Sequence, residues 1–307
     1  MPLAYIIIAL AYVACLKVIS MNVMITGASG GLGRVLADEC ARRGYNLFLT
    51  DINSEKLNLF RISMIRQYKV NVLAMACDLI CEKSFHRLME FIDSHNLRFD
   101  MLLNVAGIDH EGAFMATESS KLQSIIDLDV TSTIRMTHAI LQRRQSNRDF
   151  YLLFVSSLAS FFPMPLKATY AASKRFLLDF SCALRQELKS QKVQILTLCP
   201  AGLATTNGTL QAIIAQGLWG QLTTNRLEHI SRKTINRLTN GKKTYIPGLI
   251  NRVMKTIGCL IPRSWLAAMI FSRWGNTQSK WMKTSLNENS TPHIIFQDLS
   301  HTNQITY

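Results

Sequence analysis

The sequence predicts an α/β fold in which a single doubly wound parallel sheet carries helices on both faces. Short apolar segments alternate along residues 22–198 with longer segments whose apolar residues recur at helical spacing. The first apolar segment runs into a glycine-rich turn, as in folds that connect parallel strands by crossover helices. The chain has 307 residues, of which 48% are hydrophobic and 18% charged. This composition excludes disordered and low-complexity proteins and favours one compact domain with appendages.

The first strand and helix are marked by an apolar run and by a terminal glycine. Residues 22–26 are predicted to form a buried strand, and Leu32, Leu36 and Cys40 then recur at helical spacing. Gly44 supplies the glycine that commonly ends a helix. A strand, a glycine-rich turn and a helix therefore open the domain.

The later units repeat this order. Residues 47–50 form the second strand, Asp51 closes it, and Ser54 is the predicted cap of a helix that buries Leu57 and Phe60. The alternation predicts a parallel sheet whose crossovers share one hand. The remaining strands are predicted at residues 72–77, 101–105, 151–155 and 193–198, and the remaining helices around 85–92, 121–142 and 168–189.

Segments outside this alternation are predicted to be appendages. Residues 202–240 begin with a stretch rich in Gly, Thr and Asn and are expected to hold a substrate lid within a domain of residues 21–248. Residues 249–275 are predicted to form a basic amphipathic helical extension. Residues 276–307 are expected to be a polar tail.

The hydrophobic segment of residues 1–20 has three open interpretations. Pro2 to Leu16 carries no charge, and because a bilayer core needs about 17–25 apolar residues, the segment is a candidate membrane anchor. Alternatively Met21 is the true start, or the segment lies buried or peripheral. A cleaved signal peptide is disfavoured, since a basic start and a convincing cleavage site are missing.

Charge is distributed unevenly along the chain. The net charge is +14, and between Arg226 and Lys283 stand 12 basic residues and one acidic residue, Glu228. This run favours an anionic partner such as a phospholipid surface or an acidic carrier, although a solvated basic face explains it equally well. No reading motif accompanies the run, so nucleic acid is not expected as a partner.

Cysteine usage points to a reducing compartment. The seven cysteines include no CxxC pair and no nearby His pair that could hold zinc. We therefore expect reduced thiols in a cytoplasmic protein, and anchoring to the cytoplasmic face of a membrane by residues 1–20 stays open. No metal site is expected.

The glycine-rich turn predicts a dinucleotide site. Thr26, Gly27, Gly31 and Gly33 follow the pattern TGxxxGxG, in which glycines let the backbone approach a pyrophosphate closely. The next helix offers free N–H groups and the positive end of its dipole. Glycines in a turn can also serve loop geometry alone. The predicted cofactor contacts in the turn are Thr26, Gly27, Ser29, Gly30, Gly31, Leu32 and Gly33.

Asp51 indicates which dinucleotide is bound. Its carboxylate can accept hydrogen bonds from ribose hydroxyls and would repel a 2′-phosphate, so NAD is favoured over NADP. Arg34 is the opposing observation, because a guanidinium close to the turn could meet a phosphate. NADP therefore stays the alternative.

Tyr170 and Lys174 form the predicted catalytic pair. They stand four residues apart in a predicted helix, which places both side chains on one face. A tyrosine with a pKa of about 10 is a poor acid and a worse base at neutral pH, and a neighbouring ammonium lowers that pKa by stabilising the phenolate. Such a pair can move the proton that accompanies hydride transfer between an alcohol and a ketone.

Taken together, these motifs resemble the short-chain dehydrogenase/reductase family. Ser157 precedes Tyr170 by 13 residues, as in the family pattern, and the segment 104–107 (Asn-Val-Ala-Gly) resembles the family's Asn-Asn-Ala-Gly element. The resemblance covers roughly residues 22–205. It implies a Rossmann-like fold, a nicotinamide cofactor, and a homodimer or homotetramer. Residues 241–262 further resemble a branch of uncharacterised short-subunit bacterial dehydrogenases.

The resemblance also assigns roles to single residues. Ser157, rather than its neighbour Ser156, would orient the substrate oxygen, Tyr170 would be the acid and base, and Lys174 would hold the cofactor ribose. Asn104 would tie neighbouring strands together. An ordinary loop role for Asp78 stays open. The further cofactor contacts implied are Asp78, Leu79, Asn104, Ala106, Gly107, Tyr170, Lys174, Pro200 and Thr205.

Asp129 departs from the family pattern. It stands where the family usually has a catalytic asparagine. An aspartate keeps the shape and the main-chain carbonyl but adds a negative charge near Lys174. We therefore expect reduced rather than abolished activity.

The predicted function is an oxidoreductase that uses NAD or NADP on a small apolar alcohol or ketone, such as a lipid, steroid or acyl group. Two alternatives stay open: a 3-oxoacyl-carrier reductase, and an NAD(H)-binding sensor or scaffold without turnover. A membrane surface is a further possible partner, suggested by the basic run with its tryptophans. The lid residues that suggest an apolar substrate, although a packed helix explains them equally well, are Leu210, Ile213, Ile214, Leu218 and Trp219.

Overall fold

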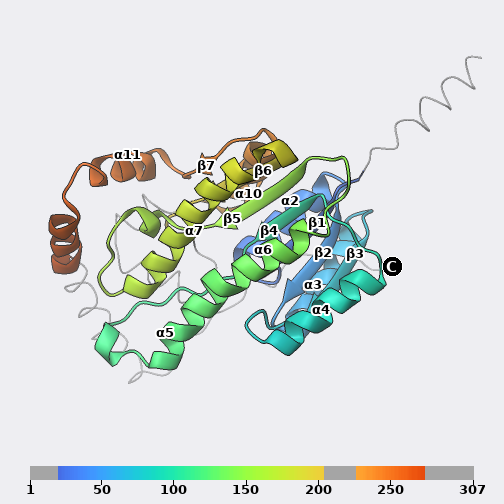
Figure 1. Ribbon diagram of the computed structural model, residues 1–307, viewed down its shortest axis with the longest axis horizontal. Coiled ribbons are helices and arrows are strands. Elements are labelled where there is room, and N and C mark those ends of the chain that lie inside the picture. Colours follow the sequence, from blue (N-terminus) through green and yellow to red (C-terminus); the bar gives the residue numbers. More distant parts are fainter. Residues whose placement is uncertain (1–19, 204–225, 274–307) are drawn as a thin grey trace, which may run out of the picture.

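The computed structural model describes residues 20–203 and 226–273, which form an α/β fold around one sheet (Figure 1). The strand order is β3-β2-β1-β4-β5-β6-β7, and every neighbouring pair is parallel. The predicted single doubly wound parallel sheet is thereby confirmed. The strands are β1 (Asn22–Thr26), β2 (Asn46–Asp51), β3 (Val72–Ala76), β4 (Met101–Asn104), β5 (Phe150–Val155), β6 (Val193–Leu198) and β7 (Thr244–Tyr245).

Helices cover both faces of the sheet. On one face pack α2 (Gly31–Arg42), α3 (Ser54–Gln67) and α10 (Leu227–Thr239). On the other pack α4 (Glu82–Ser94), α6 (Thr133–Leu141) and α7 (Ala168–Glu187). The other helical segments are η1 (Phe114–Ala116), α5 (Ser119–Ile126), η2 (Asp127–Ser132), η3 (Leu158–Phe161), η4 (Lys189–Gln191) and α11 (Leu249–Gly258).

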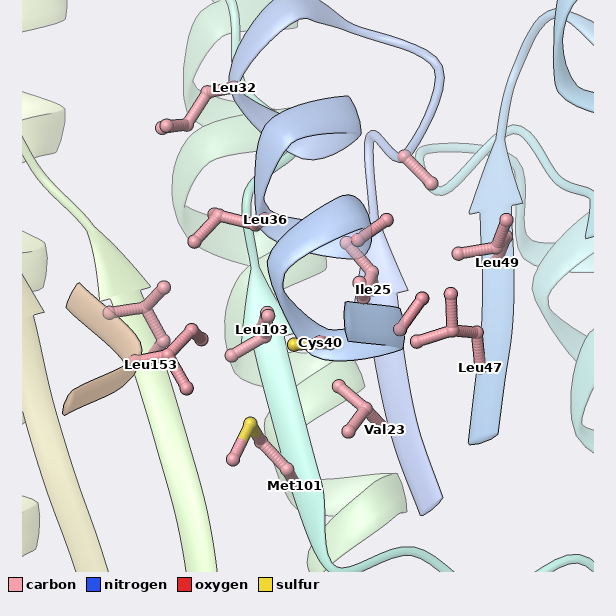
Figure 2. Close-up of a cluster of buried hydrophobic side chains, with 14 of the residues drawn as sticks. Val23, Ile25, Leu32, Leu36, Cys40, Leu47, Leu49, Met101, Leu103 and Leu153 are labelled. Carbon is pink, nitrogen blue, oxygen red and sulfur yellow. The ribbon is translucent and has the colours of Figure 1, made fainter. Parts of the chain in front are cut away.

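The core explains why the strands are apolar without alternation. Val23 and Ile25 of β1 face α2, where they meet Leu36 and Cys40 (Figure 2). Met24, between them, belongs to the cluster on the opposite face. Because both faces are covered, each strand residue is buried whichever way it points, and burial of apolar surface stabilises the fold.

Three local features differ from the sequence expectations. Asn53, not Ser54, caps α3, since its side-chain oxygen accepts a hydrogen bond from the Lys56 N–H at 2.9 Å. The helix expected over residues 121–142 is interrupted by η2, a π-helical turn. An additional strand, β7, is only two residues long and offers no periodic signal.

Part of the expected lid segment is a core helix. Within residues 202–240, α10 buries Ile230, Ile235 and Leu238 against α2 and the sheet. Residues 204–225 lie outside the described residues, as do residues 1–19 and 274–307. Most of the predicted hydrophobic segment and the polar tail therefore go undescribed. Across the residues that the structure does describe, no helix has both the length and the apolar character to cross a membrane.

The topology fixes where a ligand can bind. The carboxyl ends of all seven strands meet at one edge, and the chain order reverses between β1 and β4. Open α/β sheets bind ligands in the crevice at such a reversal. The segments carrying the predicted site residues follow the carboxyl ends of β1, β2, β4 and β5.

Candidate active site

The glycine turn after β1 is held tightly against the end of β4. Gly27 has a φ of +63°, and a Cβ on it would lie 2.8 Å from the Ala106 Cα. A Cβ on Gly33 would lie 2.1 Å from the Gly27 carbonyl oxygen. Thr26 reinforces the contact, because its Oγ1 accepts hydrogen bonds from the N–H groups of Val105 and Ala106 at 3.0 and 3.2 Å. Thr26 thus positions the turn, and its hydroxyl is hydrogen-bonded to the segment after β4.

The amino end of α2 provides the free donors that an anion needs. Gly30 is the N-cap residue, and no side chain caps the helix. The first N–H groups of a helix have no partner within it, and the helix dipole places positive charge there. This donor set fits a pyrophosphate. Leu32, in the same turn, points its side chain into the core.

Asp51 reaches the glycine turn from the end of β2. Its Oδ2 accepts a hydrogen bond from the Ser29 N–H at 2.9 Å, so these two predicted contacts are brought together. Arg34 is turned to other partners: its Nε donates to the Ser29 carbonyl at 2.8 Å, and its guanidinium lies 5.1 Å from the centre of the Phe60 ring. Asp51 thus binds the N–H of Ser29, while the Arg34 guanidinium binds the Ser29 carbonyl and lies over Phe60.

Asp78 and Leu79 serve the loop after β3. The Asp78 Oδ1 accepts a hydrogen bond from the Ile80 N–H at 3.0 Å, which is the local turn of an ordinary loop aspartate. The Leu79 carbonyl accepts one from the Ser132 hydroxyl at 2.9 Å and so joins this loop to η2. Nothing in these contacts distinguishes a cofactor role for Asp78 from its loop role.

The segment after β4 brings its backbone directly over Lys174. A Cβ on Gly107 would lie 2.8 Å from the Lys174 Nζ and 2.9 Å from the Asp129 Oδ1. Asn104, at the end of β4, is buried and donates to the Thr137 hydroxyl at 3.0 Å. Asn104 therefore ties β4 to α6 and not, as expected, to a neighbouring strand.

Tyr170, Lys174 and Ser157 come together at the start of α7. The Lys174 Nζ lies 5.6 Å from the centre of the Tyr170 ring, and the Ser157 side chain is close enough to the Tyr170 hydroxyl to lower its pKa. Ser156, the competing serine, instead donates to the Lys174 carbonyl at 2.7 Å and is buried. The structure thus separates a serine that faces Tyr170 from one that anchors α7.

Asp129 forms a buried ion pair with Lys174. Its Oδ2 lies 3.1 Å from the Lys174 Nζ and accepts a hydrogen bond from the Ser173 hydroxyl at 2.9 Å. Its Oδ1 accepts one from the Ile108 N–H at 2.9 Å. Asp129 lies in the π-helical turn η2, a distortion often found at functional sites. The pair links η2, α7 and the segment after β4.

Burial, together with the local charges, raises the pKa of Tyr170. Burial is the largest cause, and the carboxylates of Asp109 and Asp129 act in the same direction, whereas the hydrogen bond with Ser157 lowers the pKa. We had expected the Lys174 ammonium to lower it. The physical reason for the difference is that Lys174 faces the Asp129 carboxylate, so a positive and a negative charge stand together beside the phenol.

A second charged cluster beside Tyr170 escaped the sequence analysis. The Lys167 Nζ lies 2.9 Å from the Asp109 Oδ2, 3.5 Å from the Glu111 Oε2 and 5.6 Å from the centre of the Tyr170 ring. Lys167 stands three residues before Tyr170, a spacing that could have pointed to a shared helix face. The two acids lie in a segment without periodicity, where no sequence signal places them.

A small cavity of about 30 Å³ opens next to Tyr170, with room for one or two water molecules. Its lining is largely apolar and comes from the segments before and within α5 and from the turn before α7. Among its lining residues are Phe114, Leu122, Ile125, Leu166, Lys167 and Tyr170. A larger hollow of about 460 Å³ lies at the opposite, amino-terminal edge of β1, β2 and β3, far from these groups.

The segment after β6 is described only in part. The Pro200 carbonyl accepts a hydrogen bond from the Leu158 N–H at 2.7 Å and so supports the loop that carries Ser157. Thr205 and the apolar lid residues lie outside the described residues.

Comparisons with known proteins agree with this architecture. A family profile described as short chain dehydrogenase matches residues 21–212. Human 17-beta-hydroxysteroid dehydrogenase type 3 is 28% identical over 223 residues, which are 72% of this chain and 69% of that protein. A very-long-chain 3-oxoacyl-CoA reductase from Pyrenophora tritici-repentis is 32% identical over 178 residues, 56% of this chain and 52% of that protein. The alignment thus spans about half the length of that reductase.

Solved structures share the fold. An alcohol dehydrogenase from Comamonas testosteroni, specific for bulky-bulky ketones, superposes with a TM-score of 0.66 at 21% identity, covering 79% of this chain and 95% of that one. A short-chain dehydrogenase from Sphingobium yanoikuyae in complex with NADPH gives 0.65 at 23%, covering 78% and 93%. One from Burkholderia phymatum in complex with NAD gives 0.67 at 16%, covering 77% and 92%.

Proposed function

Because the chain belongs to the short-chain dehydrogenase family and is therefore an oxidoreductase, we propose that it interconverts a secondary alcohol and a ketone on an apolar substrate. One observation carries this proposal: the Ser157 side chain and the Lys174 ammonium both lie beside Tyr170. All three lie at the sheet edge where the glycine turn and Asp51 meet. This edge of the sheet therefore offers an acid in Tyr170, a hydroxyl in Ser157 that can orient a substrate, and a glycine turn that can hold a dinucleotide.

The residues at this edge fit a nicotinamide dinucleotide. The uncapped amino end of α2 would hold the pyrophosphate, and Asp51 would accept hydrogen bonds from the adenosine ribose. Lys174, held in place by Asp129, would reach the other ribose. We propose NAD over NADP because Asp51 faces the turn while the Arg34 guanidinium lies over Phe60. Relatives of this fold have been solved with either cofactor.

The side chains divide the chemistry of reduction between them. Ser157 donates a hydrogen bond to the substrate carbonyl oxygen and holds it beside Tyr170. The cofactor, when bound, supplies the hydride that reduces the carbonyl carbon. Tyr170 donates its phenolic proton to the oxygen, which becomes the alcohol, and the hydrogen bond from Ser157 is the contact that favours the phenolate that is left. In oxidation the phenolate takes the proton back.

The charges around Tyr170 favour reduction. Burial and the carboxylates of Asp109 and Asp129 raise the pKa of Tyr170, so the phenol stays protonated at neutral pH. A protonated tyrosine is the acid that reduction requires, whereas oxidation requires the phenolate. We therefore infer that the chain works more readily as a reductase than as a dehydrogenase.

The substrate class follows from the cavity and from the relatives. Phe114, Leu122, Ile125 and Leu166 present apolar surface next to Tyr170. One relative is named for a hydroxysteroid and another for a very-long-chain 3-oxoacyl-CoA. Both names support an apolar ketone, and the second keeps a 3-oxoacyl thioester as the alternative substrate.

A binding and turnover experiment tests the proposal. NADH fluorescence on mixing measures binding, and a panel of steroid ketones and 3-oxoacyl thioesters measures turnover. We expect wild type to bind NADH and to oxidise it with at least one ketone. Tyr170→Phe should bind NADH equally while turnover falls about 10²–10⁴-fold. Tyr151→Phe, which removes a hydroxyl at the far end of β5, is the matched control and should keep full turnover.

Two results would contradict the proposal. NADH binding without turnover on any ketone would leave the sensor or scaffold as the function. Full turnover by Tyr170→Phe would show that another group supplies the proton.

A further inference from the structure

One side of α11 presents apolar side chains to solvent. Leu249, Val253 and Ile257 are spaced by four residues, lie on one side of the helix, and are 69%, 49% and 54% exposed. Residues 263–273 are helical as well and continue this surface with Trp265 and Met269, both exposed. A soluble protein seldom leaves so many large apolar groups adjacent and uncovered. We call these five residues, together with Arg252 and Arg263, the α11 surface.

The opposite side of α11 is packed on the active-site loop. Gly258 abuts the Phe162 ring so closely that a Cβ would lie 2.3 Å from it. The Lys255 Nζ lies 5.7 Å from the centre of the Phe161 ring. Phe161 is the last residue of η3, the turn capped by Ser157, and Phe162 follows it directly. The helix is therefore fixed to the fold beside the substrate side of the site, and Figure 1 shows α11 and the helix after it extending away from the sheet.

The charge of this region is of one sign. Residues 249–273 contain Arg252, Lys255, Arg263 and Arg273 and no Asp or Glu. An exposed apolar face flanked by basic residues is the combination that binds anionic lipid surfaces, where each Lys or Arg near the surface contributes about 1 kcal/mol. A second copy of the chain is a poorer occupant, because a symmetric contact through this face would bring like charges together.

We propose that the α11 surface docks the protein on an anionic lipid bilayer, with the substrate side of the active site facing the lipid. An apolar ketone could then enter the site from the membrane without crossing water; this clause alone rests on the proposed function. The docking is independent of residues 1–20.

Amide hydrogen exchange on the full-length chain locates the contact. The probes are vesicles of phosphatidylcholine alone and of phosphatidylcholine with phosphatidylserine. We expect the amides of residues 249–260 to exchange several times more slowly with anionic vesicles, and less so with neutral ones. Val253→Ser/Ile257→Ser should abolish this protection. Leu59→Ser/Ile65→Ser, which removes exposed apolar groups from α3, is the matched control and should keep it.

Charge is tested separately. Replacing Arg252 and Arg263 with Ser removes about 2 kcal/mol of surface attraction, so the vesicle concentration that gives half-maximal protection should rise about thirtyfold. Exchange over 249–260 that is the same with and without vesicles would overturn the proposal. So would protection that grows with protein concentration in the absence of lipid, since that would identify a second copy as the occupant.

NADH binding by every variant, measured in the same samples, reports that the fold and site are intact. A chain that shows vesicle protection but turns over no ketone would contradict the proposed function while leaving the docking proposal standing. A chain that turns over a ketone but shows no vesicle protection would contradict the docking proposal while leaving the proposed function standing.

Discussion

Ser156 and Ser157 are adjacent hydroxyl groups with different partners. Ser156 donates to the Lys174 carbonyl, and Ser157 accepts from the Ala159 N–H at 3.1 Å while it faces Tyr170. Each hydrogen bond contributes about 1 kcal/mol to stability, so replacing either serine with Ala should lower stability by a similar amount. Ser157→Ala should also reduce turnover about 10²-fold, because the substrate oxygen loses its donor. Ser156→Ala is the control and should keep its kcat. Measuring kcat and thermal melting for both variants separates a loss of turnover from a loss of stability.

Asp129 offers a test of the charge balance at Tyr170. Asp129→Asn removes a negative charge that raises the pKa of Tyr170, so that pKa should fall. Alcohol oxidation needs the phenolate, so the rate of oxidation should begin to rise at lower pH in the variant. At neutral pH that rate should increase about tenfold for each unit by which the pKa of Tyr170 falls. Reduction needs the phenol, so the loss of the reduction rate at high pH should also move to lower pH. Thermal stability should fall as well, because buried Lys174 loses its ionic partner.

Rate profiles against pH in both directions check this prediction. Asp127→Asn, two residues away, is the control, since the Asp127 carboxylate accepts a hydrogen bond from the Gln123 side chain at 3.0 Å at the surface. If Asp129→Asn changed neither turnover nor the pH profile, the charge of Asp129 would have no part in the reaction.

Single residues were predictable from sequence where a motif fixed their spacing. Tyr170 and Lys174 lie on one face of α7 and Ser157 follows β5, while Asp129 was placed near Lys174 by the family resemblance. Lys167 and Asp109 could not be foreseen, because their contact joins a helix start to an aperiodic segment 58 residues away. Asn104 was assigned the right structural role but the wrong partner, since a buried amide bonds to whichever group the packing brings near.

Among the elements, the turn between β1 and α2 is sterically the most constrained. In Gly33→Ala the new methyl group would overlap the Gly27 carbonyl, so the turn must move, at a cost of about 1–3 kcal/mol. NADH affinity should fall about tenfold or more, as titration would measure. Gly44→Ala is the matched control: its φ is +79° and nothing lies within 4 Å of the new group, so it should lose about 1 kcal/mol of stability and keep NADH affinity. Equal NADH affinity in the two variants would contradict the assignment of this turn to the cofactor.

The regular elements were predictable because burial on both faces makes the strands continuously apolar. The π-helical turn η2 was not, since one extra residue in a helical turn leaves the apolar spacing nearly unchanged. That turn carries Asp129 and orients it toward Lys174. The helical distortion that positions Asp129 was therefore not predicted from the apolar periodicity.

At the scale of the whole molecule, the parallel sheet collects the site from distant segments. The parallel sheet and the common hand of its crossovers follow from the alternation of strands and helices, so the fold class could be predicted. The strand order was not predicted, because the same alternation fits more than one order. β7 could not be predicted, because two residues carry no pattern. Assembly into a homodimer or homotetramer stays a prediction, which light scattering of the full-length chain measures.

The role of residues 1–20 is also a whole-molecule question. A chain that begins at Met21 should fold and bind NADH as the full chain does, because β1 begins at Asn22 and the site lies beyond it. Among the described residues, it loses the hydrogen bond from the Ser20 hydroxyl to the Gly44 carbonyl at 2.6 Å. If residues 1–20 anchor the protein, only the full chain should stay with membranes after an alkaline carbonate wash, which releases surface-bound proteins. Release of both chains would contradict the anchor.

The central claim is that the Tyr170 hydroxyl delivers the proton to a ketone placed beside a bound nicotinamide. A crystal structure with NADH and an unreactive ketone analogue tests it most directly. We predict that the analogue's carbonyl oxygen lies within hydrogen-bond distance of both the Tyr170 and Ser157 hydroxyls, with the nicotinamide ring against its carbon. A Tyr170 hydroxyl turned away from that oxygen, or a site edge that leaves no space for the nicotinamide, would contradict it.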